Sequence, residues 1–154
     1  MSAQQQVINE PVSKTRLRLW LKLLKISRGI ETELRENLRK EFGATLPRFD
    51  VMAALSRNAD GMKMSAISGD LKVSNGNVTG IVDRLVSDGF VLREAVPGDR
   101  RAQRILLTKR GQQEFEIQAK AHETWVNTLL GGFDAADASA MIDRLDVAAM
   151  EGAT

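Results

Sequence analysis

Cysteine is absent from this chain of 154 residues, and only one histidine is present. Without thiols there is no disulfide and no thiol chemistry, and a zinc site built from nitrogen and sulfur ligands is not expected. No apolar run approaches the roughly 18–20 residues that a membrane span needs. The first residues, MSAQQQVINEP, lack the basic-then-apolar order of a signal peptide. Together these absences make the cytoplasm the expected location, with no metal and no membrane partner.

Signals of catalysis are also missing. The chain has no glycine-rich phosphate loop and no pair of carboxylates that stands out as an acid and base. The single histidine, His122, lies on an apolar helical seam, where a structural role is common. The sequence therefore predicts a protein that is not an enzyme and that needs no cofactor.

Charge is present but unevenly distributed. Residues 1–62 carry 11 basic and 7 acidic residues, residues 63–110 carry 9 and 5, and residues 111–154 carry 2 and 8. The net charge of +2 therefore hides a basic first two thirds and an acidic last third. Such an asymmetry is typical of a protein whose central part meets a polyanion, although many solvated surfaces are also uneven.

The chain predicts a long first helix over Val12–Glu41. Between Leu17 and Ile30 its apolar residues occupy too much of the circumference for one monomer to cover. A partner chain or a ligand pocket is expected to cover the remainder.

The central part predicts three helices followed by a hairpin. Thr45 is a plausible N-cap for a short helix to about Asn58, and Asp60-Gly61 is a turn. Two further helices follow over residues 65–71 and 74–87, and Asp88-Gly89 ends the second. Two short β-type runs flank a Pro97-Gly98-Asp99 turn. This order is that of a winged helix-turn-helix, whose second helix enters the DNA major groove.

The last third returns to a helical pattern that begins near Thr108. Its apolar positions form a seam with the alternating four- and three-residue spacing of a heptad: Phe115, Ala119, His122, Val126 and Leu129. Gly131-Gly132 breaks this helix, and Asp134 can cap a final one. The fold class is therefore mainly α with a small antiparallel β wing, and with helices on both sides of the wing lobe.

A helical wheel of residues 74–87 separates two faces. Val78, Ile81, Val82 and Leu85 cluster on one side, whereas Gly76 and Gly80 lie on the other. Each glycine costs a helix roughly 1 kcal/mol relative to alanine, and core packing does not account for them there. Their absence of side chains would let DNA approach the backbone.

Short polar residues surround these glycines. Ser74 can cap the helix and favour a phosphate, while Asn75, Asn77 and Thr79 offer donors and acceptors suited to base edges. Ser74 and Asn75 could equally be cap residues alone.

The hairpin tip PGDRRAQR carries three arginines. Arg100, Arg101 and Arg104 could enter an adjacent minor groove, which attracts arginine where it is narrow. Asp99 could hold one of them through a bidentate pair. An ordinary solvated hairpin with a surface ion pair is the alternative.

At these residues the chain closely resembles the MarR family of bacterial transcription regulators. The resemblance rests on LPRFDVMAAL, MSAISGDLKVSNGNVTGIVDRLVSDGFVLRE, PGDRRAQRILLT and KRGQQEFE, and extends over about residues 17–149. It implies a single domain over residues 1–154, with a winged lobe at about 45–110 and dimerisation helices at about 12–41 and 110–151. It also implies a homodimer on a pseudo-palindromic double-stranded DNA operator, with the apolar positions of residues 17–30 and 115–129 as dimer surface.

Carried over residue by residue, the resemblance implies a set of DNA contacts. Arg101 matches the family's minor-groove arginine, Asp99 the acid that orients it, and Arg84 a phosphate contact. The full expected set is Ser74, Asn75, Gly76, Asn77, Val78, Thr79, Arg84, Asp99, Arg100 and Arg101. Lys63 departs from the family pattern, because many members have a capping Thr or Ser there, so the helix that follows is expected to be less well capped.

The resemblance further implies a small anionic, often aromatic, effector that binds between the dimerisation helices and the winged lobe. The candidate contacts, each of which could equally be core, are Trp20, Ile30, Phe49, Met52, Phe115, His122 and Trp125. A cationic stripe of Lys14, Arg18, Lys22 and Lys25 lies in the first helix, with Arg16 and Arg28 nearby. This stripe could be a solvated face that favours DNA at long range. Alternatively, Lys22 and Lys25 would meet the phosphates of an effector such as an aromatic acyl-CoA thioester.

The function expected from these features is a dimeric repressor that loses DNA affinity when it binds its ligand. The alternatives are a ligand-responsive activator, or a winged-helix module that binds protein instead of DNA. The basic tip and the polar recognition face favour DNA.

Overall fold

The computed structural model describes residues 10–72 and 75–152. Its first helix, α2, spans Val12–Phe42 and ends at Gly43, whose φ of 59° places it in the left-handed region that glycine tolerates best. The Gly43 N–H donates to the carbonyl of Arg39 and closes the helix. The predicted long helix is confirmed to within one residue at its end.

Helix α3 spans Leu46–Ser56 and begins as its sequence predicts. The Thr45 hydroxyl accepts the N–H of Arg48 at 3.3 Å, and Pro47 lies in the first turn, where no N–H is required. Phe49, Met52 and Leu55 all lie on the buried face of this helix. The short helix therefore packs through the side chains that its spacing indicated.

The helix-turn-helix consists of α4 (Met64–Leu71) and α5 (Asn75–Ser87). Lys72 ends α4 in the left-handed region, with a φ of 53°. At the end of α5, Gly89 has a φ of 79°, and the Phe90 N–H returns to the carbonyl of Leu85. The predicted pair of helices and the glycine stop after the second are confirmed.

The wing is a sheet of three strands, one more than the sequence predicts. Strands β2 (Val91–Val96) and β3 (Asp99–Leu107) form the expected hairpin, and β1 (Met62–Lys63) adds an antiparallel edge in the order β1-β3-β2. Met62 pairs with Ile105 and Lys63 with Arg104. A strand of two residues shows no alternation, so only pairing with β3 reveals it.

The core of the winged lobe lies between these helices and the sheet. Apolar side chains from α3, α4, α5 and β3 meet there with essentially no exposure: Val51, Ala54, Ile67, Val78, Val82 and Ile105. The lobe therefore buries its central apolar residues without help from another chain.

Helix α6 spans Lys109–Leu129 and starts at a tightly specified corner. The Thr108 hydroxyl accepts the N–H of Gly111 at 3.0 Å and donates to the carbonyl of Gly89 at 2.7 Å. A side chain at position 111 would overlap the carbonyl of Phe90, so this helix can lie against the turn between α5 and β2 only with glycine there. The Thr-x-x-Gly opening is thus a packing requirement.

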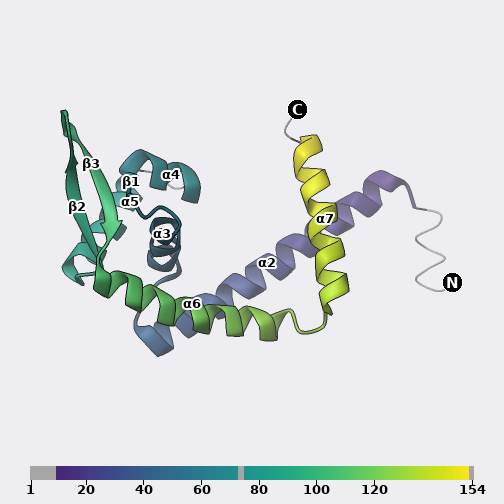
Figure 1. Ribbon diagram of the computed structural model, residues 1–154. Coiled ribbons are helices and arrows are strands. Elements are labelled where there is room, and N and C mark those ends of the chain that lie inside the picture. Colours follow the sequence, from purple (N-terminus) through teal and green to yellow (C-terminus); the bar gives the residue numbers. More distant parts are fainter. Residues whose placement is uncertain (1–9, 73–74, 153–154) are drawn as a thin grey trace.

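Helix α7 (Ala135–Gly152) follows the break at Gly131-Gly132, and the Asp134 carboxylate caps it by accepting the N–H of Asp137 at 2.8 Å. In Figure 1 the winged lobe forms one end of the molecule, and α2, α6 and α7 extend away from it. Between residues 135 and 149, every side chain but that of Ala138 is exposed. We call α2, α6 and α7 the arms, and one chain leaves most of α7 and of the first half of α2 exposed.

The seam on α6 is only partly free. Phe115 and His122 pack against Phe49 of the same chain, whereas Leu129 is exposed. The first half of the seam therefore packs partly on α3 of its own chain, and the expectation that the whole seam is dimer surface stays a prediction. No helix among the described residues is long and apolar enough to cross a membrane.

Candidate nucleic-acid interface

The outward face of α5 is open to an approaching surface. A Cβ placed on Gly76 or Gly80 would meet no described atom within 4 Å, and Asn77 and Thr79 are exposed beside them. The backbone of this helix can therefore come closer to a partner than a helix with ordinary side chains could. The predicted separation of the two faces is confirmed.

Val78 is a correction to the expected contact set. Its side chain is completely buried among the core residues of the lobe, next to Val82 and Leu85. It anchors the helix from behind and is unable to touch DNA. The assignment failed because Val78 lies close in sequence to the polar residues but on the opposite side of the helix.

The structure does not describe both of the first two residues of the predicted contact set, Ser74 and Asn75. Ser74 lies outside the described residues, and the backbone of Asn75 begins α5. Their proposed roles as cap and phosphate contact therefore stay predictions.

Two ion pairs hold the end of α5. Arg84 pairs with Asp88 one turn later, with 3.4 Å between the Arg84 Nε and the Asp88 carboxylate. Asp83 pairs with Arg93 of β2, which ties the recognition helix to the wing. The sequence did not indicate the second pair, because the two residues are ten positions apart and meet only through the sheet. Arg84 is thus partly engaged within the lobe.

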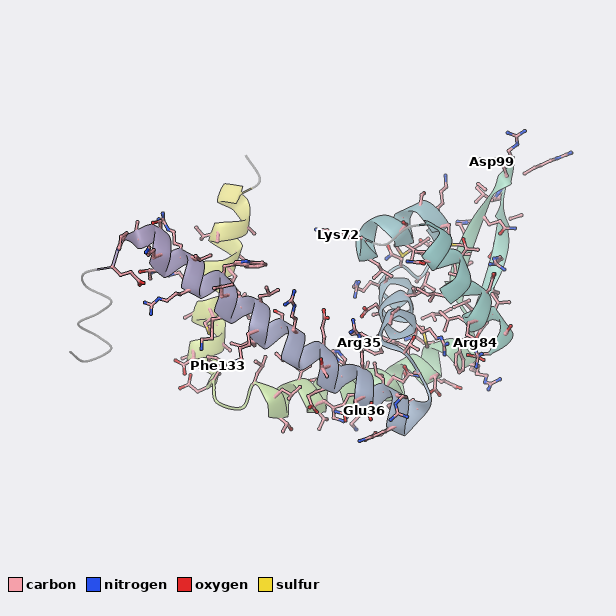
Figure 2. The ribbon with its side chains drawn as sticks, turned by 180° about the vertical axis from the view of Figure 1, so that it is seen from behind. Arg35, Glu36, Lys72, Arg84, Asp99 and Phe133 are labelled. Carbon is pink, nitrogen blue, oxygen red and sulfur yellow. The ribbon has the colours of Figure 1, made fainter. Side chains whose placement is uncertain are left out.

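The wing carries Arg100 and Arg101 on a β-bulge, whereas Arg104 is regularly paired with Glu94 and with Lys63. Ala95 pairs with Gln103, but the next residue, Val96, pairs with Asp99, so residues 100–102 are extra on β3. A bulge re-aims side chains away from the regular alternation. In Figure 2, side chains near Asp99 extend beyond the tip of the ribbon, at the opposite end of the wing from Arg84.

Asp99 acts on this tip through the main chain. Its carboxylate accepts the backbone N–H of Arg101 at 3.1 Å. Among the ion pairs that the structure describes, none joins Asp99 to an arginine side chain. In place of the expected bidentate pair, Asp99 makes this turn contact, which fixes the backbone position of Arg101.

The candidate effector residues do not form one cluster in a single chain. Phe49 stacks on His122 with 4.6 Å between ring centroids and lies 5.6 Å from Phe115. Trp125 instead lies near Phe42, Met52 is in the core, and Ile30 is half-buried. The exposed set on the first half of α2 comprises Trp20, Lys22 and Lys25.

Burial gives His122 a preference for its neutral form. Removal from water lowers the pKa of its imidazole below the usual value. The ring is therefore neutral near pH 7 and stacks on Phe49 as an uncharged aromatic.

Metal ligation finds no support in the described residues, where no group of three or more His, Cys, Asp or Glu side chains lies close together. The arrangement that is present, two helices at a turn followed by a basic β wing, defines a winged helix-turn-helix protein.

Known proteins share this arrangement. The model of the MarR family matches residues 44–102. A crystal structure of a MarR family transcriptional regulator from Silicibacter pomeroyi is 32% identical, covers 100% of both chains and superimposes with a TM-score of 0.75. The chain belongs to the MarR family.

Two further relatives are informative. The transcriptional activatory protein BadR of Rhodopseudomonas palustris is 33% identical over 98 residues, which cover 62% of this chain and 56% of that protein. The chain thus matches only about half the length of this curated relative. Sco3205 of Streptomyces coelicolor, a MarR family regulator crystallised in complex with DNA, shares the fold at 20% identity and a TM-score of 0.77, over 92% of this chain and 91% of its own.

Proposed function

We propose that this chain is a sequence-specific, DNA-binding transcription regulator that acts as a homodimer. The observation that carries the proposal is the cleared face of α5 beside a wing whose bulge presents Arg100 and Arg101. The helix would enter a major groove and the wing the adjacent minor groove. The crystal structure of Sco3205 with DNA supports the use of this fold for that purpose.

A second copy of the chain is the partner that suits the arms. Large apolar side chains on α2 and α7 are about half exposed, among them Leu19 at 57%, Trp20 at 55% and Ile142 at 59%. Exposed apolar surface on this scale marks an interface. A two-fold dimer would cover it and present two copies of α5 to successive major grooves, about 34 Å apart on a pseudo-palindromic operator.

The direction of regulation has two candidates. Repression, relieved when a ligand shifts the dimer to a form whose recognition helices no longer match the grooves, is the first. Activation is the second, and the name of the relative BadR, a transcriptional activatory protein, favours it.

The effector would be an anionic aromatic acid or its CoA thioester. The cationic stripe supports it: Lys14, Arg18, Lys22 and Lys25 are all exposed on one side of α2. Arg18 is already paired with Glu10 at 2.8 Å, so Lys22 and Lys25 are the stronger candidates for a thioester's phosphates. Titration of the protein–DNA complex with free acids and with their thioesters tests this, and release by neither class would contradict it.

Arg101→Ala tests the proposed function most directly. We expect this change to weaken operator binding by at least about tenfold, because one good groove contact contributes roughly 1–3 kcal/mol. Footprinting on DNA selected by the parent protein, with analytical ultracentrifugation to show an intact dimer, measures it. Unchanged affinity would remove the wing from the mechanism.

Asn77→Ala tests whether Asn77 reads a DNA base or only positions α5 on the DNA. If Asn77 reads a base, its loss should relax sequence preference more than it lowers binding to random DNA. Equal losses on both kinds of DNA would assign Asn77 to positioning the helix.

A further inference from the structure

A groove lies between the start of α4 and the wing. Its polar lining comes from Lys63 and Ser65 on one side and from Arg101 and Gln103 of β3 on the other, over an apolar floor that includes Ile105. Its volume is about 290 Å³. None of the described lining residues is acidic, so two cationic side chains dominate its electrostatic potential.

Only the tertiary structure brings these residues together. The unexpected strand β1 pairs Lys63 with Arg104 and thereby holds the start of α4 against β3. The bulge in β3 then supplies Arg101 from the other side. Lys63 and Arg101 are 38 positions apart along the chain, and no local pattern links them.

Lys63 also leaves the start of α4 open. It occupies the N-cap position but makes no side-chain hydrogen bond to the helix, and the first turn contains no acidic residue. The first N–H groups of a helix need acceptors, and their partial positive charge favours an anion. The groove with its two cations is the primary observation. The uncapped N–H groups at the start of α4 add donors that an anion in the groove could accept.

The size of the groove selects among anions. It is at the lower limit of the roughly 300–1,000 Å³ typical of pockets for organic ligands, and its lining includes four polar residues, Lys63, Ser65, Arg101 and Gln103. It can hold a phosphate group with several waters, each of which takes about 30 Å³. Arg101 belongs at once to this groove and to the wing tip, so an anion seated here would lie next to bound DNA.

We propose that this groove seats a phosphate of the DNA backbone, held by Lys63 together with Arg101. The inference rests on the proposed DNA-binding function and adds to it a contact by Lys63, at the start of α4 and outside the recognition helix and the wing tip. In this chain the lysine takes the place of a helix cap and contributes affinity that does not depend on sequence.

Lys63→Thr is the decisive variant, because it removes the cation and supplies a capping hydroxyl. We expect the melting temperature to stay level or rise, while the dependence of DNA affinity on salt becomes less steep. The slope of log K against log salt should fall by about 0.9 for each groove occupied, and by about 1.8 for a dimer. Fluorescence anisotropy with a short random duplex, over about 50–200 mM KCl, measures the slope.

Two matched variants complete the design. Lys109→Thr makes the same charge change at the exposed start of α6, at the far end of β3 from the groove, and should leave the slope unchanged. Lys63→Arg keeps the charge and should retain the parent slope. If Lys63→Thr and Lys109→Thr give the same slope as the parent, the groove holds no phosphate and the inference is wrong.

Further outcomes distinguish a failure of this inference from a failure of the proposed DNA-binding function. A parent protein that binds neither selected nor random DNA would overturn the proposed function itself. Replacement of chloride by inorganic phosphate at constant ionic strength tests for a free anion. Because free phosphate would compete with the DNA backbone for the groove, it should weaken DNA binding of the parent more than that of Lys63→Thr. If inorganic phosphate instead binds the parent but not Lys63→Thr while the two proteins have the same salt slope for DNA, the groove is a site for a free anion, which overturns the assignment to the DNA backbone.

Discussion

The winged lobe and the helical arms differ in how far their own chain buries their apolar side chains. In the lobe, side chains such as Ile67, Val78 and Ile105 are fully buried by their own chain. On the arms, Leu19 and Ile142 remain more than half exposed, although they are as apolar. The lobe is thus a self-sufficient unit, whereas the arms have apolar faces that need another surface to cover them.

The largest effect is expected from a substitution that disrupts the proposed dimer surface on the arms. Ile142→Glu would place a charge in the proposed dimer surface, and two-fold symmetry would introduce it twice. We expect a loss of about 4 kcal/mol or more in dimer stability, because an unpaired charge would be buried. Analytical ultracentrifugation measures the dissociation constant.

Ala140→Glu is the matched control for this change, since Ala140 is exposed on the same helix and lies on the opposite side from Ile142. It should leave the dimer nearly intact. If both variants dissociate equally, α7 does not contribute a specific apolar contact. The exposed apolar residues of the arms would then not be explained by the dimer.

The next effect concerns the corner where the lobe joins the arms. Gly111→Ala would force a methyl group into the Phe90 carbonyl and separate α6 from the turn between α5 and β2. We expect the free energy of unfolding to fall by about 3 kcal/mol, at the upper end of the usual cost of overpacking. Urea denaturation measures this loss.

Gly132→Ala provides the comparison, because a Cβ there would meet no described atom within 4 Å. Its stability should change little. A similar loss at both positions would show that backbone freedom matters at Gly111 more than the close approach to Phe90.

A smaller effect separates stability from function on α5. Gly80→Ala should raise the free energy of unfolding by up to about 1 kcal/mol, since alanine is the better helix former. The same methyl group would stand between the helix and DNA, so operator affinity should fall by about tenfold, a cost of about 1.4 kcal/mol. Thermal unfolding and anisotropy measure the two changes.

Gly29→Ala, on the exposed part of α2, adds the same methyl group in open space far from the recognition helix in sequence. It should stabilise the protein similarly without weakening DNA binding. Undiminished affinity in Gly80→Ala would contradict a close approach of DNA to α5.

The smallest effect is expected from His122. Because burial lowers the pKa of its imidazole, the unfolded chain takes up the proton more readily than the folded one. The free energy of unfolding should therefore decrease as pH falls below about 6.5, the usual histidine pKa. His122→Phe should flatten this dependence between about pH 5.5 and 8.

Asp50 has the opposite sign and acts at lower pH. Burial and the charge of Glu31 raise the pKa of its carboxyl above the usual value, so its protonated form favours the folded state. Its contribution is lost as pH rises through the carboxylate range, below the window used for His122. A slope that persists in His122→Phe would assign the dependence to another group.

Much of the fold was predictable from short stretches. The caps at Thr45 and Asp134, the helix start near Thr108 and the stop at Gly89 are each predicted correctly, because a cap or turn depends on a few neighbouring residues. The open face of α5 followed from its helical period.

Val78 was assigned to the DNA face although the helical wheel already places it with Val82 and Leu85 on the apolar side, so that error came from its polar neighbours in the sequence. The remaining differences have another cause, contact between distant residues. The packing of Phe115 and His122 on Phe49 was not expected. The sequence also missed β1 and the Asp83–Arg93 pair. Each of these depends on which element packs against which, and helical or strand periodicity carries no such information.

The sequence by itself determined where the helices begin and end, which face of α5 is cleared, and that the wing tip is basic. These are consequences of backbone preferences and of side chains a few positions apart. The tertiary structure decided that Asp99 acts through the main chain of Arg101, that Gly111 lies against Phe90, and that Lys63 and Arg101 share a groove. Those outcomes require strand pairing and helix packing, which join residues far apart in the chain.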